Sequence, residues 1–233
     1  MTSTRVLLLH GLGATGGVWD GVAAVLGGDV VAPDLPGHGT AGTLPAAYTF
    51  AALAEAVADL VDDAGTVVLG HSFGGVVALH LATRPGVRAV VALGVKVAWS
   101  DDDLARAAAL AARPATTFAT RADAVQRHLR VSGLAGLVDP ASDLAAAGVV
   151  TEGEGNWRLA QDTRAFAVGD PEVAALLLAA PCPVVLARGE RDPLVSDDDL
   201  LRLGVEPVVL PGLGHNAHVE DPVAVAALVA PYR

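Results

Sequence analysis

The chain has 233 residues, of which 52% are hydrophobic and 18% charged, so it has ample apolar material for a core and is not a disordered chain. Its net charge of −11 and its lack of a basic run argue against a nucleic acid or an anionic membrane as a partner. The single cysteine, Cys182, excludes an internal disulfide, and its place between two prolines predicts a buried, unreactive thiol.

The mean hydropathy is high, +0.48, because alanine is abundant. The longest uncharged stretch, residues 173–187, is interrupted by Pro181 and Pro183 and is shorter than the ~20 residues that cross a bilayer. Residues 7–9 form too short an apolar run for a signal peptide. We therefore expect a soluble cytoplasmic protein.

In chain order, the first part alternates short apolar runs with amphipathic segments. The apolar runs predict strands at residues 5–9, 29–32, 67–69 and 89–93. The segments between them predict helices at residues 19–26, 49–61 and 75–82, the second capped by Thr49. This order is typical of an α/β protein with a doubly wound, mostly parallel sheet and helices on both faces.

The pattern changes between residues 96 and 168, where strand-like runs disappear and helices are expected at residues 101–113, 120–131 and 139–147. The alternation resumes with a helix from Asp170-Pro171, strands at 184–187 and 208–210, and helices at 196–203 and from Asp221-Pro222. We interpret residues 1–95 and 169–233 as one core and residues 96–168 as a helical cap insertion in it.

A nucleophile elbow is predicted between the third strand and the helix after it. Residues 70–74 read GHSFG, which matches G-x-S-x-G, and Ser72 stands at the turn. The pentapeptide alone is a weak signal, but here an apolar strand precedes it and a helix with small residues at Gly74, Ala78 and Ala82 follows it. Such a turn strains the serine backbone, so its neighbours must lack bulk.

Three residue types with complementary chemistry follow strands of the predicted sheet. Ser72 follows the third strand, Asp192 the fifth and His215 the sixth, in the chain order Ser, Asp, His. Ligands bind beyond the carboxyl ends of strands in doubly wound sheets, so we expect these side chains to meet. A serine hydroxyl needs an adjacent base at neutral pH, and a histidine oriented by an aspartate supplies it.

Together these motifs resemble the α/β-hydrolase superfamily, in its serine-nucleophile branch of small, cap-bearing, esterase- or lactonase-like members. The resemblance extends from His10-Gly11 and residues 33–39 (PDLPGHG) through the serine turn to residues 189–193 and Gly214-His215. Two features depart from the family pattern. The chain begins almost at its first parallel strand, so we expect truncated N-terminal strands, and the insertion is short and rich in alanine.

The resemblance implies a catalytic triad with Ser72 as the nucleophile, Asp192 as the acid and His215 as the base. The oxyanion hole would use the backbone N–H of Phe73, the residue after the nucleophile, and by resemblance that of Leu12. His218 is an alternative base, but no glycine precedes it as Gly214 precedes His215.

Other candidate sites have simpler explanations. Asp197, Asp198 and Asp199 could replace Asp192, but they are typical of an acidic first helical turn. Asp34, His38 and His10 are expected to order their own loops. No metal-ligand spacing, dinucleotide fingerprint or P-loop lysine is present, so we expect neither a metal nor a cofactor.

The sequence thus predicts a hydrolase, a serine esterase acting on small to medium acyl esters, thioesters or lactones through an acyl-enzyme. Two alternatives stay open: the same triad could serve C–C hydrolysis, lyase or perhydrolase chemistry, or the fold could be a non-catalytic ligand receptor. Lys96 could contact an acidic group of the substrate, although a hinge lysine is the simpler interpretation. The insertion offers further candidates to line the pocket: Trp99, Leu110, Phe118, Leu129, Leu134 and Trp157.

Overall fold

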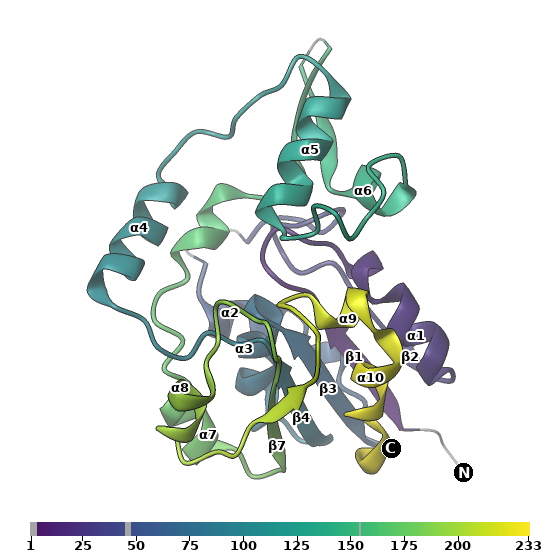
Figure 1. The fold of residues 1–233 in the computed structure, drawn as a ribbon, viewed down its shortest axis with the longest axis vertical. Coiled ribbons are helices and arrows are strands. Elements are labelled where there is room, and N and C mark those ends of the chain that lie inside the picture. Colours follow the sequence, from purple (N-terminus) through teal and green to yellow (C-terminus); the bar gives the residue numbers. More distant parts are fainter. Residues whose placement is uncertain (1–3, 45–47, 154) are drawn as a thin grey trace.

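The computed structural model describes residues 4–44, 48–153 and 155–233. At its centre lies a six-stranded sheet in the order β2-β1-β3-β4-β7-β8, with every neighbouring pair parallel (Figure 1). The mostly parallel, doubly wound sheet predicted from the sequence is confirmed. Its strands are β1 (Arg5–Leu9), β2 (Val30–Val31), β3 (Thr66–His71), β4 (Val87–Leu93), β7 (Val184–Gly189) and β8 (Val208–Leu210).

The apolar runs of the central strands are buried on both faces of the sheet. In β1, Leu7 and Leu9 belong to one core cluster, whereas Val6 and Leu8 belong to the other. Successive side chains of a strand point to opposite faces, so a strand covered on both sides must be apolar throughout.

Helices cover each face. Phe50 of α2 and Val77 of α3 pack in the first cluster, and Val22 of α1 and Val225 of α10 pack in the second. The helices of the core are α1 (Asp20–Leu26), α2 (Phe50–Ala56), α3 (Phe73–Leu81), α7 (Val173–Ala179), α8 (Asp197–Leu201), α9 (Ala217–Glu220) and α10 (Pro222–Ala227). Short 3₁₀ turns lie at η1 (Gly16–Trp19), η2 (Ala58–Leu60) and η4 (Ala230–Tyr232).

Residues 96–168, called the insertion below, follow β4 and rise above the carboxyl ends of the strands (Figure 1). They form α4 (Asp101–Ala111), α5 (Arg121–Val131), α6 (Asp143–Ala147), η3 (Thr163–Ala167) and an antiparallel hairpin of β5 (Val149–Glu152) and β6 (Asn156–Leu159). The hairpin corrects the expectation that strands are absent here. Its strands are short and only partly buried, and both carry charged and polar residues, so they lack the apolar runs of the main sheet.

Three predicted helix ends are also corrected. The helix expected over 49–61 ends at Ala56, and Val57 leads into η2 with a 3₁₀-type bond from its N–H to the Ala54 oxygen. The helix expected from Asp139 begins at Asp143, because Asp139 forms a turn in which its Oδ1 accepts from the Ala141 N–H at 2.9 Å. The helix expected from Asp170 begins at Val173, after the left-handed Glu172 (φ 48°).

Other caps agree with the sequence. Thr49 Oγ1 accepts from the Ala52 N–H at 3.1 Å, and the Asp221 side chain accepts from the first turn of α10. Among the described residues, no helix is long and apolar enough to cross a membrane.

Candidate active site

Ser72 lies at the tight junction between β3 and α3. Its backbone has φ 50° and ψ −112°, outside the usual regions for a residue with a side chain. Its N–H donates to the Leu93 oxygen at 2.8 Å, and α3 then follows with Ser72 as its N-cap. The surrounding bonds therefore hold a strained serine at the sheet edge, where the helix dipole favours negative charge.

The glycines on either side of Ser72 allow this junction to close. A Cβ on Gly70 would collide with the Gly74 carbonyl oxygen, and a Cβ on Gly74 would collide with the Leu9 and His10 oxygens. Both collisions are with backbone, which cannot swing aside as a flexible side chain can. The G-x-S-x-G spacing therefore has a steric reason in this chain.

Asp192 and His215 lie together at the same edge, on the loops after β7 and β8. The Nδ1–H of His215 donates to Asp192 Oδ2 at 2.9 Å, because an ionised carboxylate can only accept. This tautomer leaves Nε2 of a neutral His215 as a proton acceptor. The other oxygen, Asp192 Oδ1, accepts from the Leu194 N–H at 2.9 Å, and only 7% of Asp192 is exposed.

Gly94 makes room for this pair at the end of β4. Its backbone has φ +65°, and a Cβ there would lie 3.3 Å from both Asp192 Oδ2 and the His215 ring. The loop is therefore shaped at Gly94 to admit the imidazole next to its carboxylate.

His71 supports the His215 loop, a role that the sequence analysis missed. Its Nε2–H donates to the His215 backbone oxygen at 2.9 Å, and its ring centroid lies 4.6 Å from that of His215. His71 stands inside the recognisable motif, but its partner is 144 residues away in the chain. No local pattern could have indicated that contact.

His218, the alternative base, is 1% exposed and packs between the rings of Trp19 and His71, each centroid 4.4 Å away. Within the described part of the chain, neither of its ring nitrogens has a hydrogen-bond partner. Burial lowers its pKa to about 3. It is an interior aromatic ring, whereas His215 borders a cavity shared with Ser72.

The polar residues of the nearby loops hold those loops together, as expected. His10 donates from Nδ1 to the Gly11 oxygen at 2.9 Å and accepts at Nε2 from the Leu35 N–H at 2.8 Å. Burial lowers the pKa of His10, which favours the neutral ring that this pairing requires. Asp34 accepts from the Gly16 and Thr40 N–H groups, each at 2.8 Å, and these bonds hold its pKa below the usual value against the opposing effect of burial.

Two backbone N–H groups are available near Ser72. Among the described residues, neither the Leu12 N–H nor the Phe73 N–H donates a hydrogen bond. Leu12 borders both cavities that Ser72 borders, in a turn closed by the Ala14 N–H and the Gly11 oxygen at 3.1 Å. Phe73 is the first residue of α3, where N–H groups have no partner within the helix.

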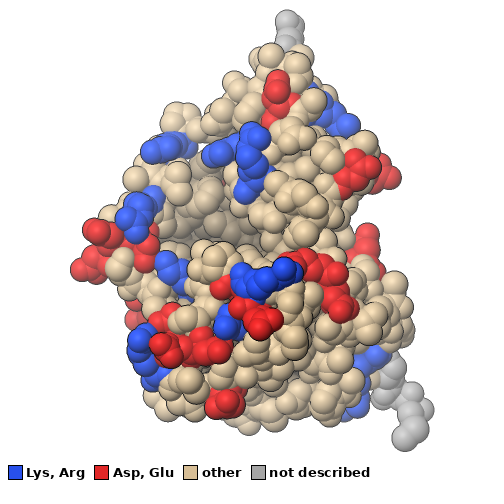
Figure 2. Space-filling view, viewed as in Figure 1, with Lys and Arg blue, Asp and Glu red and all other residues tan. Residues whose placement is uncertain are grey.

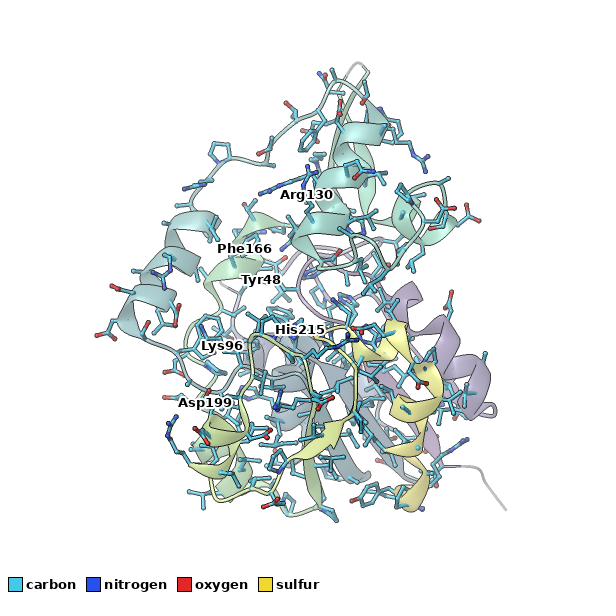
Figure 3. The ribbon with its side chains drawn as sticks, in the orientation of Figure 1. Tyr48, Lys96, Arg130, Phe166, Asp199 and His215 are labelled. Carbon is cyan, nitrogen blue, oxygen red and sulfur yellow. The ribbon has the colours of Figure 1, made fainter. Side chains whose placement is uncertain are left out.

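Two cavities meet at Ser72. Ser72 and His215 both border one of them, the serine cavity, which has a volume of about 250 Å³. It is also bordered by Gly11, Leu12, His71, Arg130, Val131 and Asn216. The apolar cavity, of about 100 Å³, extends from Ser72 to the other side, between Phe50, Val76, Trp99, Phe166 and Val168. In Figure 3, Phe166 and Arg130 of the insertion lie above His215.

Two of the expected pocket residues of the insertion border the apolar cavity. Lys96 Nζ pairs with Asp103 Oδ2 at 2.9 Å and lies 4.6 Å from the centre of the Trp99 ring. Asp103 therefore neutralises the lysine that could have contacted an acidic group of the substrate. Trp99 itself donates from its indole N–H to the Lys96 oxygen at 2.9 Å.

The other expected pocket residues lie elsewhere, and this corrects the sequence interpretation. Leu129 and Leu134 are 1% and 0% exposed, in the cluster that joins the insertion to the sheet. Phe118 and Trp157 exchange two backbone hydrogen bonds of 2.8 Å and pack against the same cluster. None of these four borders either cavity at Ser72, because their apolar side chains stabilise the insertion. Leu110 borders a third cavity, described below.

Across residues 4–44, 48–153 and 155–233, no three His, Cys, Asp or Glu side chains gather as metal ligands would. Cys182 is half-buried, and burial raises the pKa of its thiol, which disfavours the reactive thiolate.

Curated relatives match parts of the chain. Lipase LipV of Mycobacterium tuberculosis is 45% identical over 100 residues, which are 40% of this chain and 38% of that protein. A pimeloyl-[acyl-carrier protein] methyl ester esterase of Neisseria meningitidis is 45% identical over 84 residues, 34% of this chain and 26% of that one. The matches thus span well under half the length of these relatives.

Solved structures match nearly the whole fold. The thioesterase domain from the curacin biosynthetic pathway superposes with a TM-score of 0.79 at 22% identity, over 97% of this chain and 91% of that one. The esterase Rv0045c of M. tuberculosis gives a TM-score of 0.77 at 25% identity, over 98% and 83%. The family model described as "Alpha/beta hydrolase family" matches residues 6–228, and the chain belongs to that family.

Proposed function

We propose that this protein hydrolyses carboxylic esters, thioesters or lactones through a serine nucleophile and an acyl-enzyme. The observation that carries the proposal is that Ser72, on its strained turn, shares a cavity with a His215 whose Nδ1–H is bound by Asp192. The names of the curated relatives, a lipase and a methyl ester esterase, support the same class of reaction.

In the first step, Ser72 Oγ attacks the carbonyl carbon and His215 Nε2 takes its proton. The alcohol, thiol or ring oxygen then leaves with that proton, and the acyl group stays on Ser72. Water attacks the acyl-enzyme with His215 again as base, and the acid product and free serine result. Asp192 orients the imidazole and stabilises its cation.

The N–H groups of Leu12 and Phe73 are assigned to the oxyanion. Negative charge develops on the carbonyl oxygen during attack, and two fixed donors, one in the turn at Leu12 and one at the start of α3, would stabilise it. Loss of one such donor typically costs 10²–10³ in rate, a magnitude of about 3–4 kcal/mol.

The apolar cavity is assigned to the acyl group. Its volume of about 100 Å³ and its mainly aliphatic and aromatic side chains favour small to medium acyl chains. Ser72 lies at its border, so a chain held there would place its carbonyl carbon near Oγ.

The experiment is a set of p-nitrophenyl esters of graded acyl length, with thioesters and lactones, assayed on the wild type and on Ser72→Ala. The variant should lose at least about 10³-fold in kcat while it keeps its fold, because only the nucleophile is removed. Ser142→Ala is the matched control, since its hydroxyl donates to the Asp139 oxygen at 2.7 Å and it borders neither cavity at Ser72. Unchanged ester hydrolysis by a folded Ser72→Ala protein would refute the assignment.

A further inference from the structure

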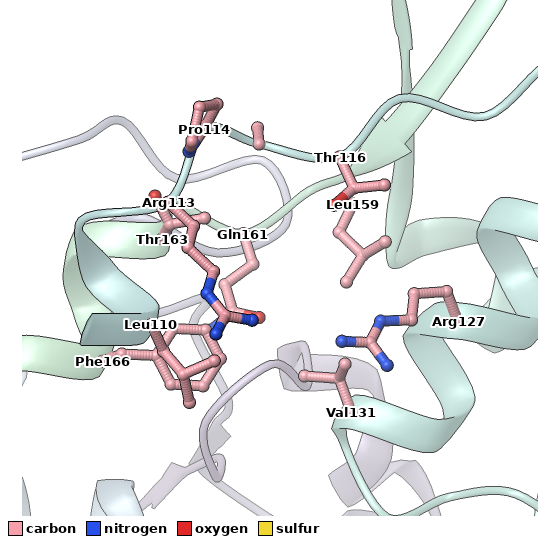
Figure 4. Close-up of a pocket in the computed structure, with 11 residues that line it drawn as sticks. Leu110, Arg113, Pro114, Thr116, Arg127, Val131, Leu159, Gln161, Thr163 and Phe166 are labelled. Atoms are coloured by element: carbon pink, nitrogen blue, oxygen red, sulfur yellow. The ribbon is translucent and has the colours of Figure 1, made fainter. Parts of the chain in front are cut away.

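A third cavity lies inside the insertion and is not used by the proposed reaction. It has a volume of about 120 Å³ and is shown in Figure 4. It borders both cavities at Ser72, since it shares Val131 with the serine cavity and Phe166 with the apolar cavity. A substrate longer than the acyl pocket would therefore extend toward it.

The charged side chains around this cavity are all positive. Arg113, just after α4, and Arg127, on α5, reach into it from opposite sides (Figure 4). No Asp or Glu is among the described residues that border it. We call this space the arginine cavity. Guanidinium groups offer planar pairs of N–H donors that match the oxygens of a carboxylate or a phosphate.

The insertion has six other basic side chains. Four of them pair with carboxylates of the insertion itself, namely Lys96, Arg106, Arg158 and Arg164, whereas Arg121 and Arg130 have no such pair among the described residues. Within the described ranges, neither Arg113 nor Arg127 has such a pair, although the chain contains 26 acidic residues. Two cations that face each other without a counter-ion repel each other, and a bound anion would remove that repulsion.

Gln161 gives independent support. It borders the same cavity from the segment between β6 and η3, and only 7% of it is exposed. Its side-chain Nε2 is buried and has no hydrogen-bond partner among the described residues. Buried donors are normally paired, so an unpaired one that borders a cationic cavity indicates an absent acceptor.

The charge distribution over the chain leads to the same interpretation. The insertion holds eight of the 15 basic residues but only nine of the 26 acidic ones, so its net charge is −1 while the rest of the chain carries −10. Figure 2 shows Lys and Arg side chains around the hollow between the insertion and the rest of the chain, called the sheet-bearing part below. An anionic group that approaches an otherwise acidic protein would be attracted to this region.

We propose that Arg113, Arg127 and Gln161 form an anion subsite that binds a carboxylate or phosphate on the part of the substrate remote from the scissile ester. This inference rests on the proposed ester hydrolysis and narrows its substrate class to esters that carry a second, anionic group.

The test compares three methyl esters of matched chain length: the monoester of a dicarboxylic acid, the neutral diester, and an ester with a terminal phosphate. The wild type should favour at least one anionic ester over the neutral one by tenfold or more in kcat/KM. Whichever anion is preferred identifies the group that the subsite accepts. A double variant, Arg113→Gln with Arg127→Gln, should bring that ratio close to one, mainly through a higher KM for the anionic ester.

The double variant Arg106→Gln with Arg121→Gln is the matched control, because it removes the same two positive charges from the insertion at side chains outside the three cavities. It should retain the wild-type ratio of kcat/KM between the anionic and the neutral ester. Equal use of charged and neutral esters by the wild type would overturn the subsite, and so would a preference that the double variant of Arg113 and Arg127 retains.

A binding measurement separates this inference from the proposed reaction. Calorimetric titration of Ser72→Ala with the anionic ester requires no turnover, and added Arg113→Gln and Arg127→Gln should weaken binding at least tenfold. Arginine-dependent binding in a protein that hydrolyses no ester would refute the reaction and retain the subsite. Ester hydrolysis with no arginine-dependent binding would refute the subsite and retain the reaction.

Discussion

The sheet-bearing part and the insertion differ in how tightly their positions are constrained. Around Ser72 the backbone is strained, the glycines fit against carbonyl oxygens, and Asp192 is almost fully buried. Helix α4 of the insertion, by contrast, has no buried residue and touches the rest of the chain mainly at η3. The first region can hold reacting atoms in place, whereas α4 presents side chains that can be replaced at little cost in stability.

This contrast assigns different roles to the two parts. Positioned groups lower the barrier of a reaction only if their supports are rigid. Side chains over the pocket select among substrates through contacts that need less precision. We therefore expect changes in the core to decide whether an ester is hydrolysed, and changes in the insertion to decide which ester.

The largest effect should follow Asp192→Asn. The amide cannot hold the Nδ1–H tautomer of His215 as a carboxylate does, so kcat should fall by about 10⁴ with the fold intact. Asp198→Asn, an exposed acid in the first turn of α8, should leave kcat unchanged. Steady-state kinetics on a p-nitrophenyl ester measures both. A loss at Asp198 equal to that at Asp192 would contradict the assigned acid.

Gly70→Ala should break the turn itself. Its Cβ would meet the Gly74 carbonyl oxygen, so strand and helix must separate, at about 3 kcal/mol in the free energy of unfolding. Gly42→Ala is the control, because a Cβ there meets nothing within 4 Å. Urea unfolding of both variants measures the difference. Equal stability of the two would show that the elbow tolerates bulk.

Acid should weaken the sheet-bearing part through its buried histidines. Burial lowers the pKa of His218 to about 3, against 6.5 in an exposed side chain. Between these values the unfolded chain binds the extra proton, so stability is full above pH 6.5 and falls as the pH drops toward 3. The loss for this one histidine is about 1.4 kcal/mol for each pH unit in that window.

His218→Leu tests this contribution, since leucine packs against Trp19 without titrating. Thermal unfolding between pH 7 and 5.5, above the range in which most carboxylates titrate, should show a shallower decline for the variant than for the wild type. Parallel curves for the two proteins would exclude His218 as a source of acid sensitivity.

The smallest effect should come from the insertion. Phe166 borders both the apolar cavity and the arginine cavity, and Phe166→Ala removes its contact with an acyl chain. We expect kcat/KM to fall about tenfold for the longest acyl chains and to change little for acetate, which corresponds to about 1.4 kcal/mol. Leu178→Ala, at a side chain that is 90% exposed, is the control. An equal fall in kcat/KM for all acyl chain lengths would contradict the separate roles expected of the two regions.

The positions of the six main strands along the chain, the G-x-S-x-G turn and the candidate residues Ser72, Asp192 and His215 could be predicted from the sequence. Each depends on a local signal: an apolar run buried on both faces, glycines beside a serine, or a polar residue directly after a strand. The hairpin of β5 and β6 could not, because its short, partly buried strands carry charged and polar residues and lack the apolar run that marks a strand buried on both faces.

Contacts between segments that lie far apart in the chain are visible only in the tertiary structure. The bond from His71 to the His215 oxygen joins residues 144 positions apart, and the pairing of Lys96 with Asp103 removes a candidate that sequence alone left open. Leu129 and Phe166 are both large apolar residues of the insertion, yet one is buried in the core cluster and the other borders the pocket. The type of a residue indicates whether its side chain will be buried, but only the packing of the folded chain determines which surface it is buried against.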